Sequence, residues 1–434
     1  MRIVDLIQRK RDGGELSRDE VDFLLKGAVS GEIPEYQAAA MLMAVFFSGL
    51  TEQETVDWTE SMLSLAPALD LSSLPGPKIG KHSTGGVGDK TSLIVGPLVA
   101  AAGVTVPMIV GRGLAHTGGT LDKIESIPGF NSRLTNQELK TVLKNVGLAL
   151  IGPSAELTPG DHKLYPLRDS TATVESIPLL VSSILSTKLA EGTDGVVLDV
   201  KTGSGALLKK MTDSRRLAQT LVTVAKRLGK KVVGVVTDMD QPLGNAVGNA
   251  LEVMEAVETL RGNGPADLVE LSLELGARML LLAHPDRTVE STKEQLFKLL
   301  NDGAALQKFR QVIEVQGGNP QVIDSFELFP TASAEFVVSS PRAGFVSRIS
   351  ADDIGQAAML LGAGRDRMDS KIDPAVGIVL EHKVGDRIQA GERLCTMYYN
   401  EETRVEDAAQ MVEDAFRISS AAPEARPLIY EVIQ

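Results

Sequence analysis

The first 66 residues carry a helical pattern of apolar positions that is interrupted by polar and proline stops. Residues 17–20 (SRDE) have the spacing of a capping box before the apolar run VDFLLKGA, and residues 51–54 (TEQE) repeat that spacing. Between them, Pro34 suits the first turn of a helix that is apolar on nearly all faces. Such a helix lies deep in a core or in a subunit interface. This region therefore predicts a small helical bundle.

After Pro75 the pattern changes to short apolar runs rich in valine, with helix-like stretches between them. Runs of this length are typical of parallel strands that are buried on both faces. The expected strands are 104–111, 147–152, 194–200 and 231–239, and the expected helices include 92–103 and 214–229. The alternation predicts an α/β domain with a parallel-rich sheet. The segment 163–193 has a helical pattern again and could return to the helical bundle.

From about Pro341 the chain alternates in short strand-like pieces, with turns at Gly385-Asp386 and Ala390-Gly391. A helix-like piece, residues 353–364, lies between them. This pattern predicts a small C-terminal α+β domain. The expected fold is therefore a helical domain, a large mixed α/β domain and this smaller third domain.

Composition narrows the function classes. The 434 residues carry a formal charge of −13 and only 4% aromatic side chains, which argues against a nucleic-acid partner. Cys395 is the single cysteine, so neither an internal disulfide nor a cysteine metal cluster can form. The N-terminal segment lacks a signal-peptide core, and no apolar run reaches membrane-spanning length. We therefore expect a cytoplasmic protein without a membrane partner.

Residues 81–92 (KHSTGGVGDKTS) are the strongest chemical signal, between a predicted strand and a predicted helix. Glycines let the backbone approach an anion, the helix start offers free N–H groups, and Lys81 adds charge. The segment is not a P-loop, because Asp89 separates Gly88 from Lys90. The alternative is a glycine-rich turn that only joins strand and helix.

A second glycine-rich segment, residues 111–122 (GRGLAHTGGTLD), also follows a predicted strand and precedes a helix. It is not a dinucleotide fingerprint, because His116 occupies the third glycine position. Two such loops at the ends of neighbouring strands would form one ligand crevice. The histidines of the two loops, His82 and His116, could be catalytic or structural, and no nearby residue gives them metal-ligand spacing.

Two further segments could line the same crevice. Residues 165–169 (YPLRD) contain Arg168, whose planar donor fork suits a heterocycle with exocyclic oxygens, and several hydroxyl residues follow it. The plainer alternative is a surface region with helical serines. Residues 201–206 (KTGSGA) follow another predicted strand and could equally form a structural turn.

Together these motifs resemble the thymidine/pyrimidine-nucleoside phosphorylase family. The matching stretches are KHSTGGVGD, GRGLAHTGGTLDKIE, YPLRD with TATVESIPL, DVKTGSGA and DMDQPLGNAVGNALEV, and the resemblance runs over essentially the whole chain. It implies phosphorolysis of a pyrimidine nucleoside, with inorganic phosphate as co-substrate, no organic cofactor, and a homodimer formed through the helical domain. The implied domains are 1–66 with 163–193 (helical), 67–162 with 194–335 (α/β), and 336–434 (C-terminal).

The resemblance also implies roles for individual residues. Phosphate would be held by Lys81, Ser83, Ser92 and Thr120. His82 would help proton movement between phosphate and base, so that His82, Arg168 and Lys81 form the expected catalytic group. The pyrimidine edge would contact Arg168 and Ser183, and its face would be lined by Tyr165 and Leu114. A structural monovalent cation is implied near the carbonyls of Gly88 and Lys90, with Leu243, Ala246 and Glu255.

Two positions depart from the family pattern. Val110 stands where the family has a serine before Gly-Arg-Gly, and Thr187 stands where it has a base-contacting lysine. Lys188 is adjacent to Thr187, but neighbouring helical side chains diverge by about 100°. We therefore expect an altered base or sugar preference, or low activity. The alternatives are a phosphoribosyltransferase, since anthranilate phosphoribosyltransferase has a related fold, and a binding protein without catalysis.

Overall fold

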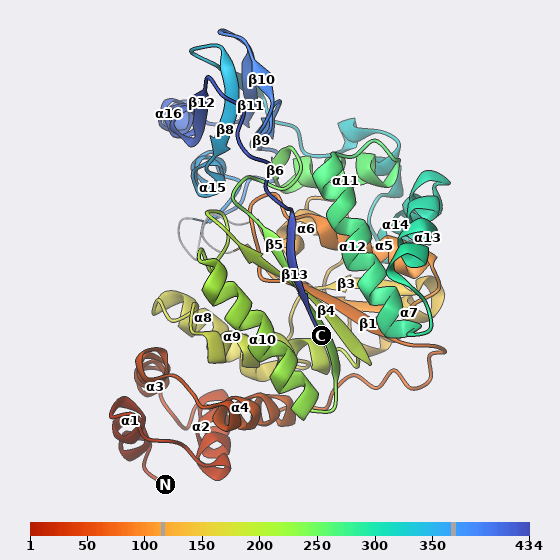
Figure 1. The fold of residues 1–434 in the computed structure, drawn as a ribbon. Helices are drawn as coiled ribbons and strands as arrows, with labels where there is room; N and C mark the ends of the chain where they lie inside the picture. Colours follow the sequence, from red (N-terminus) through yellow and green to blue (C-terminus); the bar gives the residue numbers. More distant parts are fainter. Residues whose placement is uncertain (114–117, 366–369) are drawn as a thin grey trace.

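The computed structural model describes residues 1–113, 118–365 and 370–434. It has three parts: a helical part that contains the N-terminus, a central sheet flanked by helices, and a smaller C-terminal lobe at the opposite end (Figure 1). The expected fold class is confirmed. In the described residues, no helix is both long enough and apolar enough to span a bilayer.

The helical part combines N-terminal helices with two helices from the middle of the chain. Both expected capping boxes form, at Ser17 and Thr51. The segment expected as one helix over 163–193 is two helices, which each have a proline in the first turn. They pack against α2 and α4. The helices are α1 (Ile3–Arg11), α2 (Arg18–Ser30), α3 (Glu35–Ser48), α4 (Glu52–Ser64), α8 (Pro159–Ser170) and α9 (Ile177–Ala190).

The central sheet has the order β1-β4-β5-β13, in which the first three strands are parallel. A second parallel pair, β2 with β3, continues beside β1 through a bridge between Lys78 and Thr105. The strands are β1 (Ile79–Ser83), β2 (Val106–Ile109), β3 (Leu148–Ile151), β4 (Gly195–Thr202), β5 (Lys231–Asp238) and β13 (Ile429–Ile433). The apolar runs predicted as buried strands thus occupy the middle of the molecule.

Helices cover both faces of this sheet (Figure 1), which explains why its strands are apolar on both sides. In β4, Val196 and Leu198 pack into one core with α9 and α10, whereas Val197 faces the other core with α5 and α12. The flanking helices are α5 (Thr91–Ala101), α6 (Thr120–Glu125), α7 (Asn136–Val146), α10 (Met211–Arg227), α11 (Asn249–Leu260), α12 (Ala266–Ala283), α13 (Val289–Asn301) and α14 (Ala304–Val315).

The C-terminal lobe contains two small antiparallel sheets, with the orders β10-β8-β12 and β6-β9-β11-β7. Its elements are β7 (Ala334–Ser339), β8 (Gly344–Ile349), α15 (Ala351–Leu360), β9 (Gly377–Leu380), β10 (Arg387–Ile388), β11 (Arg393–Tyr399), α16 (Val405–Ala415) and β12 (Phe416–Ser419). Two strands cross between lobe and body. β6 (Ala246–Gly248) leaves the body to pair with β9, and β13, the dark blue strand of Figure 1, returns to pair antiparallel with β5.

Candidate functional site

The first glycine-rich segment follows the carboxyl end of β1, and the described part of the second, residues 111–113 and 118–122, follows that of β2. The first connects β1 to α5 and the second connects β2 to α6. Lys123, from α6, joins them: its Nζ donates to the backbone oxygen of Asp89 at 2.7 Å and pairs with Glu252 at 2.7 Å. Thr120 is the first residue of α6. Leu114 and His116 lie outside the described residues.

Lys81 is a buried cation at the centre of this arrangement. It lies on β1, and only 1% of its surface is exposed. Its Nζ donates to the hydroxyls of Thr91 (2.7 Å) and Ser92 (3.1 Å), both in the first turn of α5. Burial lowers the pKa of Lys81 despite the nearby carboxylates of Asp89 and Asp199. An anion at the start of α5 would find both this ammonium and free backbone N–H groups.

Asp89 organises the first glycine loop. Its carboxylate accepts hydrogen bonds from Ser83 Oγ (2.5 Å) and from the Thr91 hydroxyl (2.6 Å). Burial alone would raise the pKa of Asp89, but Lys201, Lys81 and Lys123 together hold it well below its usual value. The Ser83 hydroxyl is therefore held next to Lys81, on the side where β1 ends.

His82 follows Lys81 on β1 and has a strongly lowered pKa. Burial is the main cause, and the positive charges of Lys188 and Lys81 add to it. The imidazole is therefore neutral at pH 7. A bound anion nearby would raise this pKa, because an opposite charge favours the protonated form.

The residues expected to bind the base come together between α8 and α9. Arg168 is buried, and its guanidinium donates to the carbonyls of Val174 (2.7 Å) and Leu179 (3.1 Å). Its Nε has no hydrogen-bond partner in the part of the chain that the structure describes. Its Cζ lies 5.7 Å from the Tyr165 ring centroid. Ser183 donates to the carboxylate of Asp161. Burial lowers the pKa of Arg168 and raises that of Asp161.

The two departures from the family pattern lie in buried surroundings. The Thr187 hydroxyl oxygen is buried near the carboxylate of Asp161, whose pKa it helps to lower against the effect of burial. Lys188 faces away from it, since its Nζ donates to Ile109 O (2.7 Å) and Glu191 (2.6 Å). Burial raises the pKa of Glu191 to about 7, although Lys188 acts against this shift. Val110, one residue beyond β2, is 5% exposed.

Of the five residues expected to hold a cation, Leu243, Ala246 and Glu255 are bonded to a lysine side chain. Lys90 Nζ donates to Leu243 O (3.0 Å), Ala246 O (2.9 Å) and the Glu255 carboxylate. A metal ion on these ligands would have to displace the ammonium, so the side chains present do not fit it. The resemblance predicts a bound cation here, and the position of Lys90 does not support that prediction.

Several charged residues of the site were missed by sequence reasoning. Asp89, Lys123 and Asp161 were not assigned roles. Asp89 and Asp161 accept hydrogen bonds from Ser83 and Ser183, which were, and Lys123 donates to the backbone of Asp89. The segment 201–206 begins with Lys201, which pairs with Asp199 at 2.6 Å. Both side chains are fully buried on β4. Charged residues inside an otherwise apolar strand are the signal that could have indicated this network.

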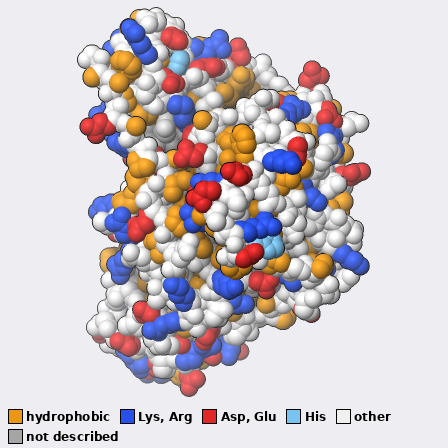
Figure 2. Space-filling view, turned by 45° about the vertical axis from the view of Figure 1, so that its right-hand side comes forward, with side chains coloured by type: hydrophobic (Ala, Val, Ile, Leu, Met, Phe, Trp, Pro, Cys, Tyr) orange, Lys and Arg blue, Asp and Glu red, His pale blue; other side chains and the backbone are white. Residues whose placement is uncertain are grey.

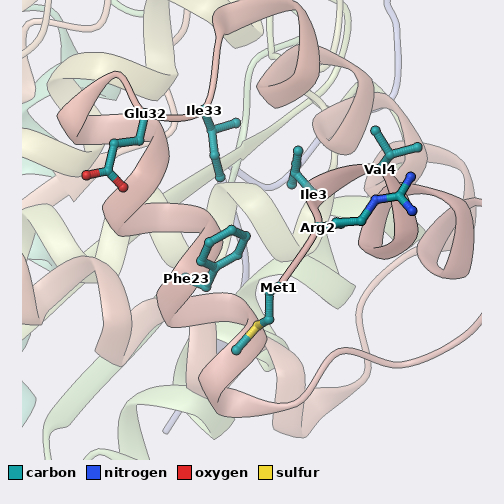
Figure 3. A pocket seen from close by; sticks show the side chains of 7 residues that line it. All are labelled: Met1, Arg2, Ile3, Val4, Phe23, Glu32 and Ile33. Carbon is teal, nitrogen blue, oxygen red and sulfur yellow. The ribbon is translucent and has the colours of Figure 1, made fainter.

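One hollow of the molecule lies far from these loops. It is in the helical part, near the N-terminus (Figure 3), and its lining residues are Met1, Arg2, Ile3, Val4, Phe23, Glu32 and Ile33. None of the predicted site residues lines it. On the face seen in Figure 2, acidic and basic side chains are interspersed.

Comparison with protein families matches three models in chain order. They are described as "Glycosyl transferase family, helical bundle domain" (residues 4–66), "Glycosyl transferase family, a/b domain" (76–306) and "Pyrimidine nucleoside phosphorylase C-terminal domain" (345–419). The second model alone covers more than half of the chain.

Two curated relatives match the whole chain. The pyrimidine-nucleoside phosphorylases of Geobacillus stearothermophilus and Bacillus subtilis are 48% and 47% identical over 433 residues, with full coverage of both chains. Among solved structures, anthranilate phosphoribosyltransferase from Thermus thermophilus superposes with a TM-score of 0.59 at 17% identity, over 71% of this chain and 98% of that one. That likeness concerns the fold alone.

Proposed function

Because the chain belongs to the pyrimidine-nucleoside phosphorylase family, we propose that it catalyses phosphorolysis of a pyrimidine nucleoside or deoxynucleoside. A phosphate oxygen bonds to C1′ of the sugar while the bond from C1′ to the base breaks. The proton of hydrogen phosphate moves to the departing base, which leaves free base and (deoxy)ribose 1-phosphate. The observation that carries the proposal is the buried Lys81 ammonium, bonded to hydroxyls at the start of α5.

Phosphate would bind where the two glycine loops meet. Lys81 supplies the positive charge, and the hydroxyls of Ser83, Ser92 and Thr120 supply further donors. The N-terminus of α5 favours an anion at the same place. When phosphate binds, the Lys81 ammonium would donate to phosphate oxygens in place of the neutral hydroxyls. A charged acceptor forms a stronger hydrogen bond than a hydroxyl does.

His82 would relay the proton. It is neutral in the free protein because of burial and the charges of Lys188 and Lys81. Phosphate beside it raises its proton affinity, so it can accept the phosphate proton and pass it to the base. A neutral histidine also avoids repelling the positive charge that develops on the sugar.

The base would bind between α8 and α9. Arg168 keeps its Nε–H without a partner among the described residues, and its positive charge would stabilise the pyrimidine anion as the glycosidic bond breaks. Ser183 would contact the same edge, while Tyr165 lines the face. Leu114, expected on the same face, lies outside the described residues.

The test is a nucleoside panel. The pure protein is incubated with thymidine, deoxyuridine, uridine or cytidine, with and without phosphate, and free base is followed by chromatography. Phosphate-dependent release supports phosphorolysis. Transfer that requires magnesium and phosphoribosyl pyrophosphate would favour a phosphoribosyltransferase instead, and no release under either condition would favour a binding protein.

We further propose that Val110 and Thr187 alter the substrate preference. A hydroxyl and a charge that the family places near phosphate and base are replaced by an isopropyl group and by a threonine whose hydroxyl oxygen is buried. Restoring them with Val110→Ser and Thr187→Lys should raise kcat/KM for thymidine or uridine by about 10-fold or more. Thr141→Lys, on the exposed side of α7, is the matched control. Rapid cleavage of either nucleoside by the unaltered protein would contradict this idea.

We also propose a homodimer formed through α1 and α3. These helices pack together and expose large apolar side chains: Val4 is 49%, Tyr36 73% and Phe47 80% exposed. A second copy of the chain would bury them. Phe47→Glu should therefore weaken self-association in sedimentation equilibrium, whereas Phe297→Glu, on α13, should leave it unchanged. A monomeric unaltered protein at micromolar concentration would contradict the proposal.

A further inference from the structure

Lys90 is a buried lysine whose ammonium contacts residues that are distant from it in the sequence. It directly precedes α5 and is fully buried. Its ammonium contacts three groups that come from the segment between β5 and α11 and from α11 itself: two backbone carbonyls and the carboxylate of Glu255. A buried ammonium needs such partners, because an uncompensated charge is costly to remove from water.

These partners form the kind of oxygen cradle that binds a monovalent metal ion. Backbone carbonyls replace the hydration shell of K⁺ where it is bound by protein, and hard cations prefer oxygen ligands. An ammonium is similar in size to K⁺, and here it lies 3.0 Å from Leu243 O and 2.9 Å from Ala246 O. The other carboxylate oxygen of Glu255 accepts from the backbone N–H groups of Asn245 (2.9 Å) and Ala246 (3.2 Å), which fixes its direction.

The cradle is too tight to hold a metal ion beside the lysine. A side chain at Gly244, which has φ +66°, would lie 3.0 Å from Lys90 Nζ and would collide with the Glu255 carboxylate. A side chain at Gly88, with φ +74°, would lie 2.6 Å from Leu243 O. The backbone thus closes around the ammonium from two sides.

We propose that the Lys90 ammonium is a built-in monovalent cation that occupies the place where the family resemblance implies a metal ion. The protein then needs neither K⁺ nor Na⁺ for stability or activity. The Lys90 ammonium also links the first glycine-rich segment to residues 242–246. This segment continues into β6, which pairs with β9 in the sheet of the C-terminal lobe.

A second lysine holds the same segment from the lobe side. Lys383 Nζ donates to Gly244 O (2.7 Å), to Pro242 O and to Asp267 (3.0 Å). The segment 242–246 is therefore held by Lys90 from the body and by Lys383 from the lobe. Because Lys90 cannot dissociate, this junction does not vary with the salt composition of the medium.

The experiment compares melting temperatures in KCl, NH₄Cl and tetramethylammonium chloride at equal ionic strength. The unaltered protein should have the same Tm in all three salts. Lys90→Ala should melt roughly 3–5 °C lower in tetramethylammonium, because Glu255 and two carbonyls lose their buried partner. It should recover a large part of that loss in KCl or NH₄Cl, whose cations fit the vacated space.

Lys10→Ala is the matched control. Lys10 is also buried and paired with a carboxylate, Glu54, but it donates to a single backbone carbonyl of the described residues, that of Gly14. Its variant should lose stability without distinguishing K⁺ from tetramethylammonium. The proposal is overturned if the unaltered protein is stabilised specifically by K⁺, if both variants respond alike, or if Lys90→Ala fails to fold in KCl. None of these readouts depends on catalysis.

Discussion

Lys81 and Lys90 lie nine positions apart at the two ends of one glycine-rich loop, and both are buried, yet their surroundings differ completely. Lys90 is bonded to two carbonyls and a carboxylate. Among the described residues, Lys81 is bonded only to the hydroxyls of Thr91 and Ser92. A buried lysine with strong partners holds the structure together, whereas one with weak partners is prepared to receive a negative charge. The difference lies in the partners and not in the residue type.

Removing Lys81 should have the largest effect on activity. We expect Lys81→Met to lower kcat/KM by about 10³-fold, because the developing transition state loses a charged donor. Its Tm should fall less than that of Lys90→Ala, because burial of this ammonium opposes folding, whereas Asp89 loses only one of the three lysine charges that hold its pKa down. Steady-state kinetics and thermal melts measure both quantities.

Added phosphate sharpens the same test. The unaltered protein should gain about 2.7 kcal/mol of stability at a phosphate concentration 100 times its Kd, and Lys81→Met should gain much less. Lys209→Met, which removes an exposed lysine paired with Asp352, should behave like the unaltered protein. If Lys81→Met melted at as low a temperature as Lys90→Ala, the proposed difference between the two lysines would be wrong.

Lys188 and Glu191 form an intermediate case with a smaller expected effect. Burial raises the pKa of Glu191 from 4.5 to about 7, so the folded protein binds this proton more tightly than the unfolded chain does. Its contribution to stability is therefore present below about pH 4.5 and is lost as the pH rises through 7. The loss is on the order of 3 kcal/mol.

Glu191→Gln should remove this pH dependence. Urea unfolding at pH 5 and pH 8 should give a larger difference for the unaltered protein than for the variant. Equal differences would mean that the Lys188 ammonium keeps Glu191 ionised throughout, and the pair would then resemble Lys90 with Glu255.

The sequence predicted local features well, because they depend on neighbouring residues. The capping boxes at Ser17 and Thr51 and the strand before each glycine loop follow from short-range patterns, and all are present. The motifs also indicated the family, which the comparisons confirm. The roles of individual site residues stay predictions, although the structure brings Lys81, Ser83 and Ser92 together.

Long-range partners could not be predicted from the sequence. Lys90 was expected to offer its backbone carbonyl to a cation, and only the fold reveals that its side chain reaches Glu255. The placement of β13 beside β5 is similar, since its short apolar pattern does not specify which strand it joins. The helical pattern over 163–193 also did not indicate the break between α8 and α9, which residues 171–176 form.

The return of β13 to the central sheet has a consequence for the order of biosynthesis. β5 leaves the ribosome long before residues 429–433, so its outer edge stays without a partner while the whole C-terminal lobe is being made. An open strand edge invites pairing with other chains. The nascent protein therefore carries an open strand edge until β13 has been made, and pairing of β13 with β5 closes that edge from within the same chain.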